Sequence, residues 1–310
     1  MNTHEKGGNL KPAKRNDKKQ ETELQYLEKI KKLAVISMFS DDELMGRLVL
    51  KGGNAIDLIY RLSSRASVDV DFSIENEFEE SELEIIETKI RKVLEDTYLA
   101  ENIKVFDIKF TLRPSKMEKE ASKFWGGYRV EFKVTPKDVY EENKDKLDYL
   151  RRSASVVGPS QSRTFKIDIS KFEYCTGKKE EDLDGYTIYV YSPEMLAIEK
   201  IRAICQQMPE YKEIVKTLKP SPRPRDFFDI YLLINQFSVD LKNDSNIELL
   251  KRMFEIKMVP LSFLKNIEKY RDYHKAEFAS LKDTIKAGMV LKEFDFYFDY
   301  VVKQVKGLPI

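Results

Sequence analysis

The stretch LVLKGGNAIDLIYRLSSRASVDVDFS, residues 48–73, constrains the fold more strongly than any other part of the chain. Its first apolar residues, Leu48–Leu50, predict a short β-strand that ends at two adjacent glycines. A short helix is expected over residues 54–60, and a second strand follows that carries Asp69 and Asp71. Two strands joined through a glycine turn and a helix indicate an α/β fold.

In that second strand, successive side chains point to opposite faces of the sheet. One face is apolar and belongs in the core, whereas the other carries Ser67, Asp69, Asp71 and Ser73. Carboxylates two residues apart lie about 6.6 Å apart along a strand, so both can converge on one divalent cation or on a pair of cations. Mg²⁺ is expected, with Mn²⁺ as the alternative, because Mg²⁺ is usually shared between carboxylates and substrate phosphates. An acidic pair on a strand can also be simply solvated.

The glycine turn itself predicts a phosphate site. Gly52 and Gly53 have no Cβ, so their backbone can approach a ligand closely and adopt positive φ. The free N–H groups and the dipole at the start of the following helix favour a phosphate. Arg65, just ahead of the acidic strand, is placed to clamp a triphosphate or to pair with Asp69.

Two later segments carry further candidates. The strand expected over residues 164–172 places Lys166 and Asp168 on one face, opposite its apolar residues. Asp168 can join the first two carboxylates if the strands are neighbours, although a lone Lys-x-Asp more often forms a cross-strand ion pair. The helix expected over residues 194–207 carries Lys200. A lysine suits a polyphosphate as a mobile point charge, and the alternative is a solvated lysine on an amphipathic helix.

The composition limits the kinds of partner and site. Lys and Arg number 54 against 53 Asp and Glu, a net charge of +1, so any nucleic-acid contact must come from local basic patches. Two cysteines and two histidines argue against a disulfide framework and a zinc site, and Cys175 and Cys205 are expected to be buried thiols. No apolar run reaches the roughly 18 residues needed to span a bilayer, and no signal peptide is evident. We therefore expect a soluble, cytoplasmic protein that does not contact a membrane.

Three regions are expected along the chain. Residues 1–20 are polar and Lys-rich, which predicts a disordered basic arm. Residues 21–191 should form the α/β domain, a mixed sheet flanked by helices, with a Gly- and Asp-rich turn at residues 177–185. Residues 192–310 should form a helical domain that closes the cleft. Helices are expected at residues 21–38, 81–99, 136–152, 194–207, 247–256, 260–279 and 282–305 and from residue 224, and further strands at residues 103–112, 127–135 and 186–191.

The segment KGGNAIDLIYRLSSRASVDVDF resembles the first motif of the AbiEii/AbiGii-type nucleotidyltransferase toxins, a branch of the polymerase-β-like nucleotidyltransferase superfamily. The segments FKIDI, IEKIRAI and RPRDFFDIYLL resemble the later motifs in the same order, so the resemblance covers roughly residues 48–233. Asn54 departs from the pattern, in which small or hydroxyl residues are common. The resemblance implies a polymerase-β-like mixed sheet followed by a C-terminal helical bundle.

The resemblance also implies a reaction, in which a hydroxyl attacks the α-phosphate of an NTP and pyrophosphate leaves. Asp69, Asp71 and Asp168 would hold Mg²⁺ and act in catalysis. Asp226 is the first aspartate of the fourth motif and would have a catalytic or acceptor-positioning role, although an Asp near a helix N-terminus is also favoured by the helix dipole. The residues expected to bind the nucleotide are Lys51, Gly52, Gly53, Arg65, Ser67, Lys166 and Lys200.

By the same resemblance, the chain is the toxin of a two-component, type IV-like toxin–antitoxin or phage-defence system, with a winged-helix antitoxin. The expected acceptor is RNA, most often the 3′ end of tRNA in this family, and its modification would inhibit translation. We also hypothesise that Ser67 accepts a nucleotide or phosphate and thereby silences the enzyme. The alternatives are a nucleotidyltransferase that modifies a protein or a small molecule, and a nucleotide-binding module without catalysis.

Overall fold

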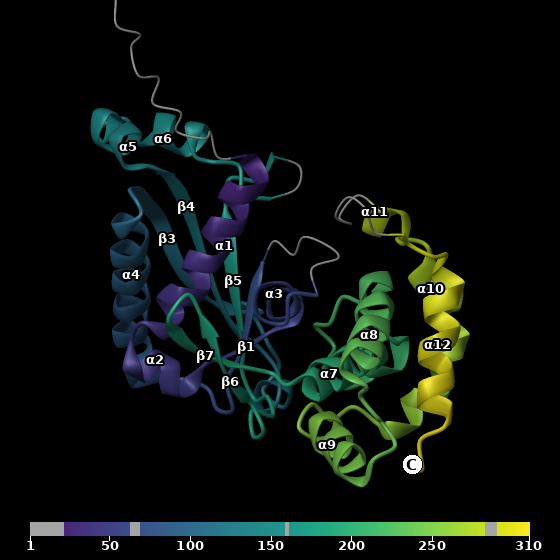
Figure 1. The fold of residues 1–310 in the computed structure, drawn as a ribbon. Helices are drawn as coiled ribbons and strands as arrows, with labels where there is room; N and C mark the ends of the chain where they lie inside the picture. The colour runs from purple at the N-terminus through teal and green to yellow at the C-terminus, as the bar shows by residue number, and fades with distance from the viewer. Residues whose placement is uncertain (1–21, 63–68, 159–160, 283–289) are drawn as a thin grey trace, which may run out of the picture.

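The computed structural model describes residues 22–62, 69–158, 161–282 and 290–310 (Figure 1). Within these residues, a mixed sheet has the strand order β3-β4-β5-β2-β1-β7-β6. The basic arm expected at residues 1–20, and the candidates Arg65 and Ser67, lie outside the described residues. The strands are β1 (Val49–Lys51), β2 (Val70–Ser73), β3 (Ile103–Arg113), β4 (Gly127–Pro136), β5 (Phe165–Ser170), β6 (Lys179–Leu183) and β7 (Tyr186–Val190).

Two long helices, α1 (Glu23–Phe39) and α4 (Leu83–Ala100), cover the apolar face of the sheet. Phe39 of α1 packs edge-on against Phe72 of β2, with ring centroids 5.8 Å apart. The two helices are tied together where the hydroxyl of Tyr98 donates to the carbonyl of Ile30 at 2.6 Å. The other helices of this half are α2 (Asp42–Arg47), α3 (Gly52–Asn54), α5 (Lys137–Asn143) and α6 (Leu147–Ser153).

The C-terminal half is helical and lies on the other side of the sheet (Figure 1). Its first helix starts where Ser192 caps the backbone N–H of Met195 and Pro occupies the first turn, as predicted. Aromatic rings join the later helices, with Phe227 stacked on Phe298 at 5.1 Å. The helices are α7 (Pro193–Cys205), α8 (Pro224–Phe237), α9 (Asp244–Glu255), α10 (Arg271–Lys275), α11 (Ala279–Lys282) and α12 (Phe294–Lys306).

The structure confirms the α/β class, with a mixed sheet followed by helices, and one hydrophobic cluster runs through both halves. Cys175 and Cys205 are buried free thiols, as expected. No helix among the described residues has the length and apolarity needed to cross a bilayer.

Several expectations about local structure are wrong. Residues 261–270, expected to be α-helical, form a 3-10 helix, and residues 144–146 separate α5 from α6. The segment 177–185 contains strand β6, which pairs antiparallel with β7 at the edge of the sheet. Its sequence, KEEDL, is mostly charged and exposed, which suits an edge strand but has no apolar alternation to reveal it. The last helix begins at Phe294, and residues 290–293 are not helical. Strand β2 begins at Val70, so Asp69 immediately precedes the strand.

Candidate active site

Four charged residues form a row across the middle of the sheet. Lys51 of β1 is in register with Asp71 of β2, Asp71 with Asp168 of β5, and Asp168 with Arg129 of β4. Residues paired in this way point to the same face of a sheet. Because α1 and α4 cover the apolar face, the row points toward the C-terminal half. The prediction that the two acidic strands are neighbours is confirmed.

The turn before this row requires glycine at its first position. Gly52 has φ +70°, and a Cβ on it would lie 2.5 Å from Oδ2 of Asp71. The turn therefore presses its backbone against the carboxylate. Asn54, the departure from the family pattern, donates from Nδ2 to the carbonyl of Asp69 at 2.7 Å and so ties the turn to the start of β2.

The residues that follow the glycine turn are held against α1 by a buried ion pair. Residues Ala55–Ile59 form a π-helical turn instead of continuing α3. Within it, Asp57 receives the ammonium of Lys31 from α1 at 3.3 Å, and both side chains are buried. This buried pair fixes the glycine turn against α1, in a place where the sequence suggests only an amphipathic helix.

Two hollows meet at Asp71. The larger, which we name the glycine hollow, has a volume of about 790 Å³. The smaller, which we name the arginine hollow, has a volume of about 320 Å³. Candidates around the glycine hollow are Lys51, Gly52, Gly53, Asp69, Asp71, Lys166, Lys200 and Asp226. Around the arginine hollow lie Lys51, Asp71, Arg113, Trp125, Arg129, Asp168, Glu173, Arg202, Arg223 and Lys257.

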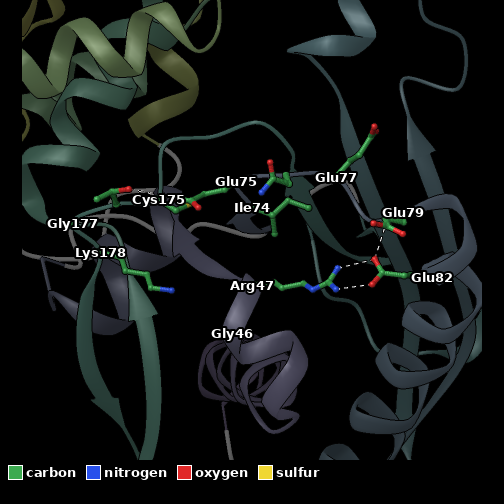
Figure 2. A pocket seen from close by; sticks show the side chains of 12 residues that line it. Gly46, Arg47, Ile74, Glu75, Glu77, Glu79, Glu82, Cys175, Gly177 and Lys178 are labelled. Carbon is green, nitrogen blue, oxygen red and sulfur yellow. Dashed lines mark hydrogen bonds and ion pairs between the residues drawn. The ribbon is translucent and has the colours of Figure 1, made fainter.

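A third hollow, of about 470 Å³, is lined by none of the predicted site residues that the structure describes (Figure 2). Its wall is acidic, with Glu75, Glu77 and Glu79 near Glu82. Arg47 donates two hydrogen bonds to Glu82, at 2.8 and 3.0 Å. Those predicted site residues that have a described position thus gather around the first two hollows.

The three candidate carboxylates, Asp69, Asp71 and Asp168, differ in their partners. Burial raises the pKa of Asp71 to about 7, although the charge of Lys51 opposes this rise. Burial also raises the pKa of Asp69, against the charge of Lys166. Neither forms an ion pair with a residue that the structure describes. Asp168, in contrast, accepts hydrogen bonds from Nε and Nη2 of Arg129 at 2.6 and 2.8 Å.

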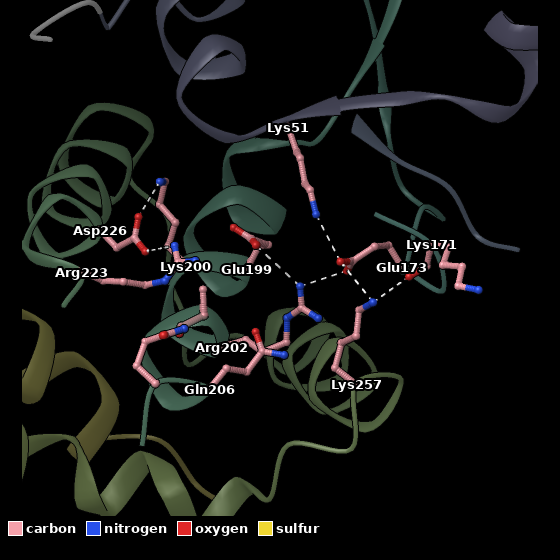
Figure 3. Close-up of polar contacts among 12 residues, drawn as sticks. Lys51, Lys171, Glu173, Glu199, Lys200, Arg202, Gln206, Arg223, Asp226 and Lys257 are labelled. Carbon is pink, nitrogen blue, oxygen red and sulfur yellow. Dashed lines mark hydrogen bonds and ion pairs between the residues drawn. The ribbon is translucent and has the colours of Figure 1, made fainter. Parts of the chain in front are cut away.

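Lys51 points to a buried carboxylate that sequence reasoning missed (Figure 3). Its Nζ lies 3.1 Å from Oε1 of Glu173, which Lys257 also approaches at 3.4 Å. Nη2 of Arg202 donates to the other oxygen of Glu173 at 2.9 Å. Burial alone would raise the pKa of Glu173, but these three cations together bring it below its ordinary value. Glu173 is a single acid in a loop, so no sequence pattern marks it.

Lys200 and Asp226 belong to a second buried ion cluster (Figure 3). The ammonium of Lys200 lies 3.0 Å from Asp226 and 2.8 Å from Asp229. Arg223 donates to the second oxygen of Asp226 at 2.8 Å. Burial would raise the pKa of Asp226, but Lys200 and Arg223 bring it below the ordinary value. The cluster locks α7 to the start of α8 and places both motifs on the wall of the glycine hollow.

The donor atoms suit a divalent cation that is shared with a substrate. Within the described ranges, no three His, Cys, Asp or Glu side chains gather closely enough to hold a metal ion by themselves. Asp69 and Asp71 nevertheless offer two carboxylates without ion-pair partners, beside the glycine turn. One or two carboxylates completed by phosphate oxygens and water is the usual protein site for Mg²⁺. Asp168 would have to leave Arg129 to become a third ligand.

A mixed sheet with an Asp-x-Asp pair beside a glycine turn, facing an open hollow, suits an enzyme that binds a nucleotide together with a divalent cation. The sequence profile described as "Nucleotidyl transferase AbiEii toxin, Type IV TA system" matches residues 34–300, and the chain belongs to this family. The family predicted from the motifs, and the enzyme class, are thereby confirmed. Membership also implies an NTP substrate and an antitoxin partner.

Solved structures that match the chain include a putative nucleotidyltransferase from H. pylori. It is 16% identical, with a TM-score of 0.47, over 90% of this chain and 93% of that one. The nucleotidyltransferase toxin MenT4 from Mycobacterium tuberculosis is 10% identical, with a TM-score of 0.43, over 92% and 93% of the two chains. No curated protein matches the chain.

Proposed function

We propose that the protein transfers a nucleotide from an NTP to the 3′ end of tRNA, in a reaction that depends on Mg²⁺. The observation that carries this proposal is the pair Asp69 and Asp71, which faces the glycine hollow next to the turn at Gly52. The pair lacks a cationic partner within the described residues, as a site for a cation and a polyphosphate requires.

The triphosphate is placed against the backbone of Gly52 and Gly53, with Lys166 and Lys200 on the surrounding wall. Lys51 is held by Glu173 and positions the row. When bound to Asp69 and Asp71, Mg²⁺ would offset the charge that develops on the α-phosphate. Mn²⁺ would serve as the alternative ion.

The acceptor hydroxyl forms the new oxygen–phosphorus bond while the bond to pyrophosphate breaks. Its proton passes to Asp168, which lies beside Asp71 in register and becomes a base when Arg129 releases it. Asp226 holds Lys200 and the start of α8 in place, which supports a positioning role on the acceptor or nucleotide side.

Membership of the family supports a proposal about the biological setting. A tRNA that carries an extra nucleotide at its 3′ end cannot be aminoacylated, so translation in the cytoplasm would stop. The antitoxin partner is proposed to be a winged-helix protein. The domain division at residue 192 and the basic arm at residues 1–20 remain predictions.

The test is a labelling assay with each of the NTPs in turn, total RNA and Mg²⁺. We expect label in RNA of tRNA size that RNase removes and protease does not. Asp69→Asn should give no label. Label that only protease removes would identify a protein acceptor, and label in neither fraction would point to a small molecule. Nucleotide binding without any labelled product would indicate that the protein is a nucleotide-binding module without catalytic activity.

Self-modification of Ser67 has a separate test, since this residue lies outside the described part of the chain. Mass analysis of the Ser67 peptide, from protein purified with and without the antitoxin, should reveal an added nucleotide or phosphate. An unmodified peptide in both preparations would remove the hypothesis.

A further inference from the structure

The arginine hollow adjoins the catalytic row on the side of Asp168. Its wall includes Asp71, Asp168 and Arg129, but neither glycine of the turn. The glycine hollow has the complementary wall, with both glycines and Asp69 but without Asp168. Because both hollows include Asp71 in their walls, ligands bound in the two hollows would both lie beside its carboxylate.

We propose that the arginine hollow binds a backbone phosphate of the acceptor RNA strand, with Arg202 as its buried anchor. This inference rests on the proposed transfer to RNA and adds the place where the acceptor strand is held. It assigns the triphosphate to the glycine hollow and the acceptor to the arginine hollow.

The anchor is a buried guanidinium with unused donors. Arg202 is only 2% exposed. Its Nη2 donates a hydrogen bond to Glu173 at 2.9 Å and lies 3.6 Å from a carboxylate oxygen of Glu199. Its Nε and Nη1 atoms are buried without a hydrogen-bond partner among the described residues. A guanidinium presents five N–H donors in a fixed fork that fits phosphate oxygens, and buried unused donors are costly. A phosphate in the hollow would satisfy them.

The charge of the hollow agrees with such a ligand. Among its described lining residues, six carry a positive charge and four carry a carboxylate. One of those carboxylates, Glu173, is already shared among three cations. Since the whole chain has a net charge of only +1, this excess is the kind of local basic patch that RNA binding requires.

An aromatic ring on the same wall selects a nucleic-acid strand over a free polyphosphate. Trp125 lines the hollow, with the ammonium of Lys257 5.7 Å from its ring centroid. Stacking of bases on aromatic rings, combined with a positive groove, is how proteins bind single strands without reading their sequence. A volume of about 320 Å³ lies at the low end of ligand sites, as expected for one nucleotide.

The test measures RNA and NTP binding separately, on the full-length protein. The RNA probe is a fluorescein-labelled, single-stranded oligonucleotide that ends in CCA, and the nucleotide probe is a fluorescent NTP with Mg²⁺. The variants are Arg202→Lys, which keeps the charge and removes the fork, and Arg113→Gln, on a side chain that is 47% exposed. Arg252→Gln, on a side chain of α9 that is 57% exposed, is the matched control.

Both hollow variants should weaken RNA binding about tenfold and leave NTP binding unchanged. Arg113→Gln should also lower the slope of log affinity against log salt by about 0.7, whereas Arg202→Lys should leave that slope as it is. Arg252→Gln should change none of these quantities. Because Arg113 lies at the rim, its variant keeps the test valid if Arg202→Lys fails to fold.

Equal RNA affinity for Arg113→Gln and the wild type would overturn the proposal. Loss of NTP affinity in Arg202→Lys, with RNA affinity retained, would assign the hollow to the triphosphate and also overturn it. If the wild-type protein binds the NTP but no RNA, the proposed RNA acceptor fails together with this inference. RNA binding that no variant alters would refute the inference alone.

Discussion

Replacing Gly52 with alanine should lower the rate of nucleotidyl transfer far more than the loss of fold stability explains. At φ +70° an L-residue costs about 1–2 kcal/mol relative to glycine. The new Cβ would also lie 2.5 Å from Oδ2 of Asp71, roughly 1 Å closer than an ordinary contact. Strand β2 is held between β1 and β5, so the carboxylate of Asp71 must rotate away. A displacement of about 1 Å at a reacting site costs on the order of 10²-fold in rate.

The assay combines the rate of nucleotidyl transfer with thermal unfolding. Gly185→Ala is the matched control, because Gly185 has φ +86° and an added Cβ there meets nothing within 4 Å. Both variants should lower Tm by about 2–6 °C, since both pay the same backbone cost. Only Gly52→Ala should lose about 10²-fold in transfer rate.

Wild-type rates in Gly52→Ala, with the lowered Tm, would refute the argument that the turn and Asp71 are fitted to one another at the reacting centre. A similar loss of rate in Gly185→Ala would show that activity follows stability and not the contact with Asp71.

Two further substitutions test the buried charges. Burial raises the pKa of Asp71 to about 7, so its ionised form costs stability that grows as the pH rises from about 4 to 7. Asp71→Asn should therefore abolish transfer yet stabilise the metal-free protein by roughly 2–4 kcal/mol at pH 8, with no gain near pH 4, measured by urea unfolding in EDTA. Lys200→Met removes the cation between Asp226 and Asp229 and should lower the unfolding free energy by about 3–5 kcal/mol. A loss below 1 kcal/mol in the same urea titration would contradict that view of the cluster.

The faces of the acidic strands could be predicted because their apolar residues alternate. Phe165, Ile167 and Ile169 are buried, which leaves Asp168 on the other face, and Val70 and Phe72 do the same for Asp71. The register that sets Asp168 beside Asp71 could not be predicted, because it joins strands far apart in the sequence. Only the family resemblance pointed to it.

The sequence pattern did not predict that Arg202 and Glu173 are buried. Arg202 occupies the polar side of an amphipathic helix, and only packing against the sheet and the later helices buries it. Glu173 stands alone in a loop. Strand β6 was missed for a different reason. Asp184 and Gly185 do form the two-residue turn of a hairpin, which is a recognisable signal. The charged strand before them, however, has no apolar face that would identify it as a strand.

The charged row can form only after β5 has been synthesised. Its members come from four strands, and Asp168 is the last of them to leave the ribosome. A slip of one residue in any of these pairings would turn the carboxylates toward the apolar side. A nascent or prematurely terminated chain without β5 therefore has no complete row, and under the proposed function such a chain would not transfer nucleotides.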